Sequence, residues 1–104
     1  MDYIEIDKTA IPYKFDMQIG GSTYTFEIQY NAEHDFFTID LYLGTEVLVY
    51  GEKLVYGKPL FETIRNEKFP DVIIIPLDST KQEIRITYDN LGESVLLYVI
   101  ERNG

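Results

Sequence analysis

The stretch YKFDMQIGGSTYTFEIQY, residues 13–30, decides the fold class of this chain. Its first half, 13–19, has an apolar residue at every second position with Lys, Asp and Gln between, and its second half, 23–30, repeats the alternation. A period of two is that of a strand with one buried face, whereas a helix buries every third or fourth residue. Gly20 and Gly21 accept the backbone conformations of a tight turn. The stretch therefore predicts an antiparallel hairpin.

Alternating or apolar segments continue outward from this hairpin in both directions. Short strands are expected at 3–7, 37–43, 47–50, 54–56, 72–77, 84–88 and 94–101. Short strands at this spacing, with no long helical period, are typical of antiparallel barrels and sandwiches. The sequence therefore predicts an all-β fold, a single-domain antiparallel β-barrel or sandwich of about eight short strands that spans residues 1–104. The expected core comprises Phe15, Ile19, Phe26, Ile28, Ile39, Leu41, Ile74, Ile86, Leu97 and Val99.

Two segments, 72–77 and 95–100, are apolar at adjacent as well as alternate positions. This pattern is typical of strands that are covered on both faces. Pro76 cannot donate a ladder hydrogen bond, so the end of its strand is expected at a sheet edge or a bulge. Residues 59–70 fit either one helical turn or an irregular crossing, and the pattern does not choose between them.

The tetrapeptide Leu-Val-Tyr-Gly occurs twice, at 48–51 and 54–57. Each glycine permits a sharp turn or a bulge, and a turn is expected at Gly51-Glu52 or at Glu52-Lys53. Each tyrosine could stack outward on a partner or fold inward at a corner, because its ring packs while its hydroxyl stays wet. A further tyrosine, at 42, is out of phase with the apolar positions of its own strand. The candidate protein-interface residues are therefore Tyr42, Tyr50, Gly51, Tyr56 and Gly57.

Composition and charge exclude several classes of function. Eighteen acidic residues against nine basic ones give a formal charge of −9, and the bases are scattered, which disfavours nucleic-acid and anionic-membrane binding. The absence of cysteine excludes disulfides, thiolate catalysis and Cys-based metal sites. No apolar run approaches the roughly 18–20 residues that a membrane helix needs. The N-terminus lacks the basic start and apolar stretch of a signal peptide, which indicates synthesis in the cytoplasm.

Residues with catalytic or ligand chemistry are few. The single histidine, His34, follows Ala32-Glu33 in a polar loop and is expected to be solvated. The run 78–83 lacks the glycine and the ligand spacing of a calcium loop, so it is interpreted as a connecting loop. Asp16 and Glu27 could face each other across the first hairpin, but solvent-facing acids are common in so acidic a chain. The sequence thus predicts no enzyme, no metal and no cofactor.

The same strands carry motifs that are similar to those of a known family. They are Tyr24-Thr25-Phe26, Tyr30-Asn31, FTIDLY at 37–42, LVYGKPLF at 54–61, Phe69-Pro70, IPLD at 75–78, TYDNLG at 87–92 and VLLY at 95–98. With these motifs the chain resembles the phage baseplate plug family, small proteins of contractile tails in phages and prophages. The similarity spans nearly the whole chain, and its motifs are structural rather than catalytic.

The resemblance implies a structural virion component in the tail baseplate, made in the host bacterial cytoplasm. Such a plug would sit in the central hub, near the channel for tape-measure protein and DNA, and a negatively charged lumen would not hold DNA. Its partners would be other tail proteins of the hub, tube or spike, with a homo-oligomer in the assembly as a further option. The alternative is a small carbohydrate-binding β-sandwich module, against which the absence of Trp counts. A small barrel enzyme or lipid carrier would need a large internal cavity.

Overall fold

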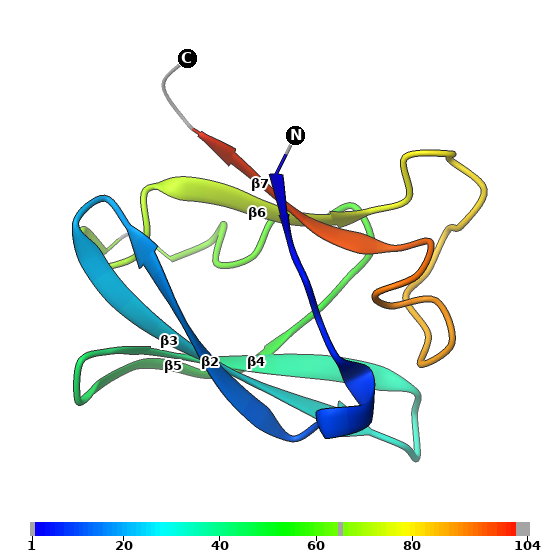
Figure 1. Ribbon diagram of the computed structural model, residues 1–104, viewed down its shortest axis with the longest axis horizontal. Coiled ribbons are helices and arrows are strands. Elements are labelled where there is room, and N and C mark those ends of the chain that lie inside the picture. The colour runs from blue at the N-terminus through cyan, green and yellow to red at the C-terminus, as the bar shows by residue number, and fades with distance from the viewer. Residues whose placement is uncertain (1, 65, 102–104) are drawn as a thin grey trace.

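Two antiparallel sheets make up the regular structure of residues 2–64 and 66–101, the part of the chain that the computed structural model describes. They form the two layers seen in Figure 1, with strand orders β2-β3-β4-β5 and β1-β7-β6. The prediction of an all-β fold is confirmed, and two separate sheets make it a sandwich rather than a barrel. The elements are β1 (Asp2–Ile4), a 3-10 turn η1 (Lys8–Ala10), β2 (Tyr13–Ile19), β3 (Ser22–Asn31), β4 (Phe36–Leu43), β5 (Glu46–Lys53), β6 (Val72–Leu77) and β7 (Leu96–Glu101).

The predicted hairpin is formed by β2 and β3. Gly20 and Gly21 both have positive φ, at 59° and 84°, which is the conformation that this turn requires. The register pairs Phe15 with Phe26, and their rings stack with centroids 5.3 Å apart. Because directly paired residues of antiparallel strands share a face, this register directs the apolar side of the hairpin into the sandwich.

The core lies between the sheets and agrees closely with the prediction. Phe26, Ile28, Ile39, Leu41, Ile74, Ile86 and Leu97 are buried, whereas Phe15, Ile19 and Val99 are partly buried and pack against them. The predicted core omitted several buried residues of the connecting segments, because these segments have no long period that marks a buried face. These are Leu54, Leu60, Phe61 and Leu91.

The strand predicted at 84–88 is wrong, because its backbone N–H groups bond to side chains instead of a neighbouring strand. The Thr87 N–H donates to the Asn90 side chain, and the Tyr88 N–H donates to Asp35, 53 residues away in sequence. Ile84 is 87% exposed whereas Ile86 is buried, so the alternating residues do not share one buried face. The segment forms part of a long connection between β6 and β7.

The turn predicted at Gly51-Glu52 or Glu52-Lys53 is also wrong, because β5 runs to Lys53. β5 continues through Gly51, where a positive φ of 71° and a shift in the β4–β5 register mark a bulge. The strand predicted at 54–56 is replaced by a crossing from one sheet to the other. The Leu54 N–H donates to the Phe37 carbonyl on β4, while the Gly57 and Leu60 N–H groups donate to carbonyls of β6.

Residues 59–64 and 66–70 continue this crossing as irregular turns, which decides the question that the sequence left open. The strand that follows, β6, pairs with β7 only and lies at the edge of its sheet. The missing N–H of Pro76 therefore breaks no central ladder, as predicted.

Candidate protein-interaction surface

The bulge in β5 brings three of the predicted interface residues together on the outer face of the four-stranded sheet. Asp40, in β4, is a buried carboxylate whose Oδ1 accepts the Gly51 N–H at 2.7 Å, and whose Oδ2 accepts the Gln29 amide at 3.0 Å. A buried carboxylate needs such donors, because its charge has lost its water. These bonds fix the bulge, and the bulge presents Tyr50 outward beside Tyr42.

Tyr42 is held by contacts on both of its sides. Its hydroxyl donates to Glu27 Oε1 at 3.0 Å, and Lys14 Nζ lies 5.2 Å from the ring centroid, within the range of a cation–π contact. The hydrogen bond to Glu27, together with burial and the charge of that carboxylate, raises the pKa of Tyr42 to about 12. The hydroxyl is therefore a fixed donor at neutral pH.

Tyr50 is the exposed member of the pair. Its ring meets that of Tyr42 edge-on, with centroids 6.3 Å apart and planes at 85°, and the residue is 67% exposed. A rigid aromatic side chain that is already supported on one edge loses little conformational freedom when a partner covers it. This group, Lys14, Glu27, Tyr42, Tyr50 and Gly51, is called the tyrosine surface below.

The other two predicted residues, Tyr56 and Gly57, lie in the crossing segment instead. The Tyr56 hydroxyl accepts the Asp78 N–H at 3.1 Å, and the partly buried ring packs against the core. Gly57 has a φ of 73° and donates its N–H to the Pro76 carbonyl. The tyrosines of the two Leu-Val-Tyr-Gly copies therefore point in opposite directions, with Tyr50 directed to solvent and Tyr56 packed against the core.

Lys14 and Glu27 were not predicted as part of this surface. The register of β2 and β3 pairs them directly, and Glu27 in turn pairs with Asp40 of β4. Only the pairing of three strands brings them beside Tyr42, so the signal was in the hairpin register rather than in any local motif. Asp16 is not opposite Glu27, since it pairs with Thr25 and accepts its hydroxyl at 2.7 Å.

The remaining titratable residues that the sequence singled out have structural or solvent contacts. The His34 ring is 67% exposed and lies 3.5 Å from Glu33. Asp78 is buried and accepts from Thr80, Gln82 and Glu83, and the bonds from Thr80 contribute most to lowering its pKa. Within residues 2–64 and 66–101, no three His, Cys, Asp or Glu side chains gather as metal ligands would. The same residues include no helix long and apolar enough to cross a bilayer.

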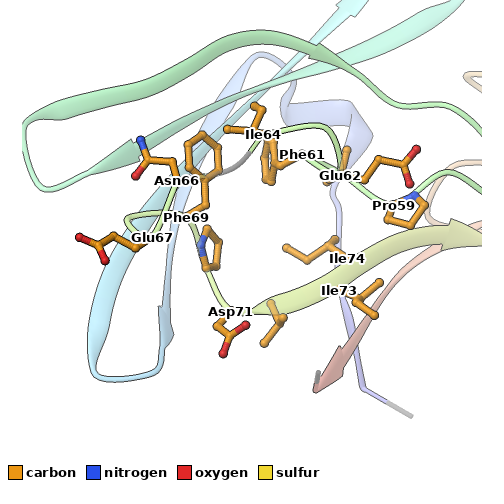
Figure 2. A pocket seen from close by; sticks show the side chains of 13 residues that line it. Pro59, Phe61, Glu62, Ile64, Asn66, Glu67, Phe69, Asp71, Ile73 and Ile74 are labelled. Atoms are coloured by element: carbon orange, nitrogen blue, oxygen red, sulfur yellow. The ribbon is translucent and has the colours of Figure 1, made fainter. Parts of the chain in front are cut away.

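A pocket of about 550 Å³ lies against the irregular segment before β6 (Figure 2). Phe61 and Phe69, with ring centroids 5.4 Å apart, form its aromatic wall, and Ile74 of β6 lies across from them. The carboxylates of Glu62 and Glu67 point away from its centre in Figure 2. Its described lining contains no Ser, Thr, Cys, His, Lys or Arg, and its titratable side chains are the carboxylates of Glu62, Glu67 and Asp71.

A comparison with protein-family models decides the class of this molecule. Residues 1–102 match the model described as "Cyanophage baseplate Pam3 plug gp18". The chain belongs to the phage baseplate plug family. The resemblance inferred from the sequence motifs is thereby confirmed. No curated protein matches the chain significantly.

Membership of the plug family makes this chain a structural protein of the phage tail baseplate and implies contact with other tail proteins. In this chain, hydrogen bonds to Glu27 and Asp40 on the outer face of the four-stranded sheet support the exposed Tyr50. That arrangement suits recognition of a protein surface, because aromatic anchors dominate such interfaces.

Proposed function

We propose that this plug-family chain is a hub-associated assembly protein of the baseplate that acts by binding other tail proteins and carries out no catalysis. The family match over residues 1–102 is the observation that carries the proposal. The chain would be made in the host bacterial cytoplasm and incorporated near the central channel. A net charge of −9 supports a position beside passing DNA, since like charges would keep the DNA from adhering.

The tyrosine surface is the contact through which the chain would bind the hub. Tyr50 is the proposed anchor, because it is the most exposed of the three predicted interface tyrosines and is supported by Tyr42. Tyr42 and Gly51 hold it in place, through the hydrogen bond to Glu27 and the bulge, respectively. Tyr56 and Gly57 would contribute by shaping the crossing segment rather than by touching a partner.

A matched pair of variants, Tyr50→Ala and Tyr56→Ala, tests this assignment. Tyr50→Ala should weaken binding to the purified hub protein of the same phage by at least tenfold, the usual effect at an aromatic anchor, and leave the Tm unchanged. Tyr56→Ala should lower the Tm, because it removes packing and leaves the buried Asp78 N–H without its acceptor. Isothermal calorimetry and thermal denaturation measure the two quantities on each variant.

A loss of Tm in both variants, with no separate binding defect, would mean that both tyrosines are structural and that the interface lies elsewhere. Unchanged binding by Tyr50→Ala would remove the tyrosine surface from the proposal.

Carbohydrate binding, the alternative function considered from the sequence, receives less support from the geometry. The rings of Tyr42 and Tyr50 are nearly perpendicular, at 85°, so they form no flat platform on which a sugar chain could stack. Affinity electrophoresis in gels containing neutral polysaccharides would detect such binding, and retardation that Tyr50→Ala abolishes would favour this alternative.

A further inference from the structure

The outward side of the three-stranded sheet is apolar over its whole width. Paired positions share a face of a sheet, and the register gives one outward row of Tyr3, Tyr98 and Ile75. Two further rows complete it, and the outer apolar face is therefore made of Tyr3, Ile73, Ile75, Leu77, Leu96, Tyr98 and Ile100. The alternate positions, such as Leu97 and Ile74, are buried in the core.

This face is separate from the core. None of its seven residues belongs to the buried cluster or packs against it within the described chain. Tyr3 is 46% exposed, and its ring meets that of Tyr98 edge-on at 6.2 Å. A sheet face that stays in water normally carries polar residues at alternate positions, and here the outward positions of β6 and β7 carry none. The sequences of β6 and β7 are typical of strands covered on both faces, but within the described residues the core covers only one face of their sheet.

Acidic residues lie at one edge of the outer apolar face. Glu5 and Glu93 are both exposed, and they line a shallow depression together with Tyr3 and Leu96. The residues of β1, β6 and β7 include no Lys or Arg. Arg102, which follows β7, lies outside the described residues. An apolar centre with a negative border is complementary to an apolar patch bordered by Lys and Arg.

A second copy of this chain does not fit the same face well. Face-to-face pairing would bring two acidic borders together in a chain whose net charge is −9. The sheet is also small, roughly 20 Å long by 10–15 Å wide from strand rise and spacing. That area is well below the roughly 800 Å² that each partner buries in a stable interface. Apolar contact over this face therefore needs additional attraction between charged residues at its border.

We propose that the outer apolar face docks this chain onto a second baseplate protein, at an apolar patch bordered by basic residues. The proposal rests on the proposed function, since it takes the partner to be a tail protein. It adds a second contact surface, on the layer of the sandwich opposite to the tyrosine surface (Figure 1). The chain would then join two neighbours in the assembly, one on each outer face.

The experiment measures binding to each purified tail protein of the same phage, one at a time, by biolayer interferometry. Tyr98→Lys places a charge in the centre of the outer apolar face, and Gln18→Lys places the same charge on an exposed position of β2 as the matched control. Tyr98→Lys should weaken one complex at least tenfold, while Gln18→Lys should stay within twofold of wild type. If Tyr98→Lys fails to fold by far-UV circular dichroism, Ile100→Lys, near the strand end, takes its place.

The border is tested with the double variant Glu5→Lys and Glu93→Lys. Loss of attraction to a basic border should weaken the same complex and flatten its dependence on salt. A complex that Tyr98→Lys and the double variant leave unchanged would overturn this inference and leave the proposed function standing. If the wild-type chain binds no tail protein, the proposed function itself fails. Wild-type dimers in sedimentation velocity that Tyr98→Lys dissociates would assign the face to a second copy instead.

Discussion

Replacing Phe26 with alanine removes the ring that lies deepest in the β2–β3 hairpin. Phe26 is fully buried in the centre of β3, and its register neighbours are Phe15 on β2 and Leu41 on β4. The Phe15 ring stacks on it at 5.3 Å, with the planes only 4° apart. Ladder hydrogen bonds hold all three strands, so the surrounding side chains cannot collapse into the space that the ring leaves.

The expected loss is about 3–5 kcal/mol, the usual cost of Phe→Ala in a core, and about 0.5–1.5 kcal/mol of it comes from the stacked pair. A domain of this size has a total stability of about 5–15 kcal/mol, so the variant remains folded but marginal. Urea denaturation, with a slope of about 2 kcal/mol per molar, should show the midpoint falling by roughly 1.5–2.5 M.

Phe15→Ala is the matched control, because it removes the other ring of the same stack from a half-buried position. It should cost about half as much, since less buried surface is lost and no closed cavity forms. A Phe26→Ala cost below about 1 kcal/mol, or one smaller than that of Phe15→Ala, would refute the assignment of Phe26 to the centre of the core.

Three further predictions concern charge and backbone geometry. The pKa of Asp78 is lowered in the folded protein, so the ionised carboxylate stabilises the fold at pH values above the ordinary Asp pKa of about 4. This contribution to the free energy of unfolding is lost as the pH falls below about 4 and through the lowered pKa. Asp78→Asn should therefore reduce the Tm at pH 7 more than at pH 3, and a pH-independent difference would contradict this. Gly92 has a φ of 84°, and a Cβ there would lie 3.0 Å from the Ile6 carbonyl oxygen, so Gly92→Ala should cost about 1–3 kcal/mol in urea denaturation. An absorbance titration in which Tyr42→Phe identifies the Tyr42 signal should give that tyrosine a midpoint near pH 12. The midpoint should move toward pH 10 in Glu27→Gln, and an unmoved midpoint would exclude Glu27 as the cause of the raised pKa.

Local patterns predicted the strands whose partners are near in sequence. Phe26 and Ile28 alternate with polar residues in β3, which pairs with β2 after a single turn, and both side chains lie in the core between the two sheets. Ile84 and Ile86 have the same period and form no strand. Hydrogen bonds to residues distant in sequence, such as that from the Tyr88 N–H to Asp35, determine the backbone conformation of this segment. A local sequence pattern does not indicate such bonds.

The sequence supplied candidate interface residues but not their grouping. Tyr42, Tyr50 and Gly51 lie together because the bulge at Gly51 keeps β4 and β5 paired, and their role in an interface stays a prediction. The inward direction of Tyr56 depends on the crossing from β5 to β6, which the sequence did not reveal. The functional class came from family motifs, because the titratable residues form no sequence pattern that is typical of a reaction.

The crossing segment at 54–60 also has a mechanical consequence. It bonds to the Phe37 carbonyl of one layer and to the Ile74 and Pro76 carbonyls of the other, so main-chain hydrogen bonds link the two sheets across the sandwich. Layers joined only by apolar packing can slide past each other, because that attraction has no direction. Here, a force that shears one layer against the other must stretch these bonds together. We therefore expect the sandwich to transmit force as a single rigid body, with the two sheets staying together when either outer face is pushed.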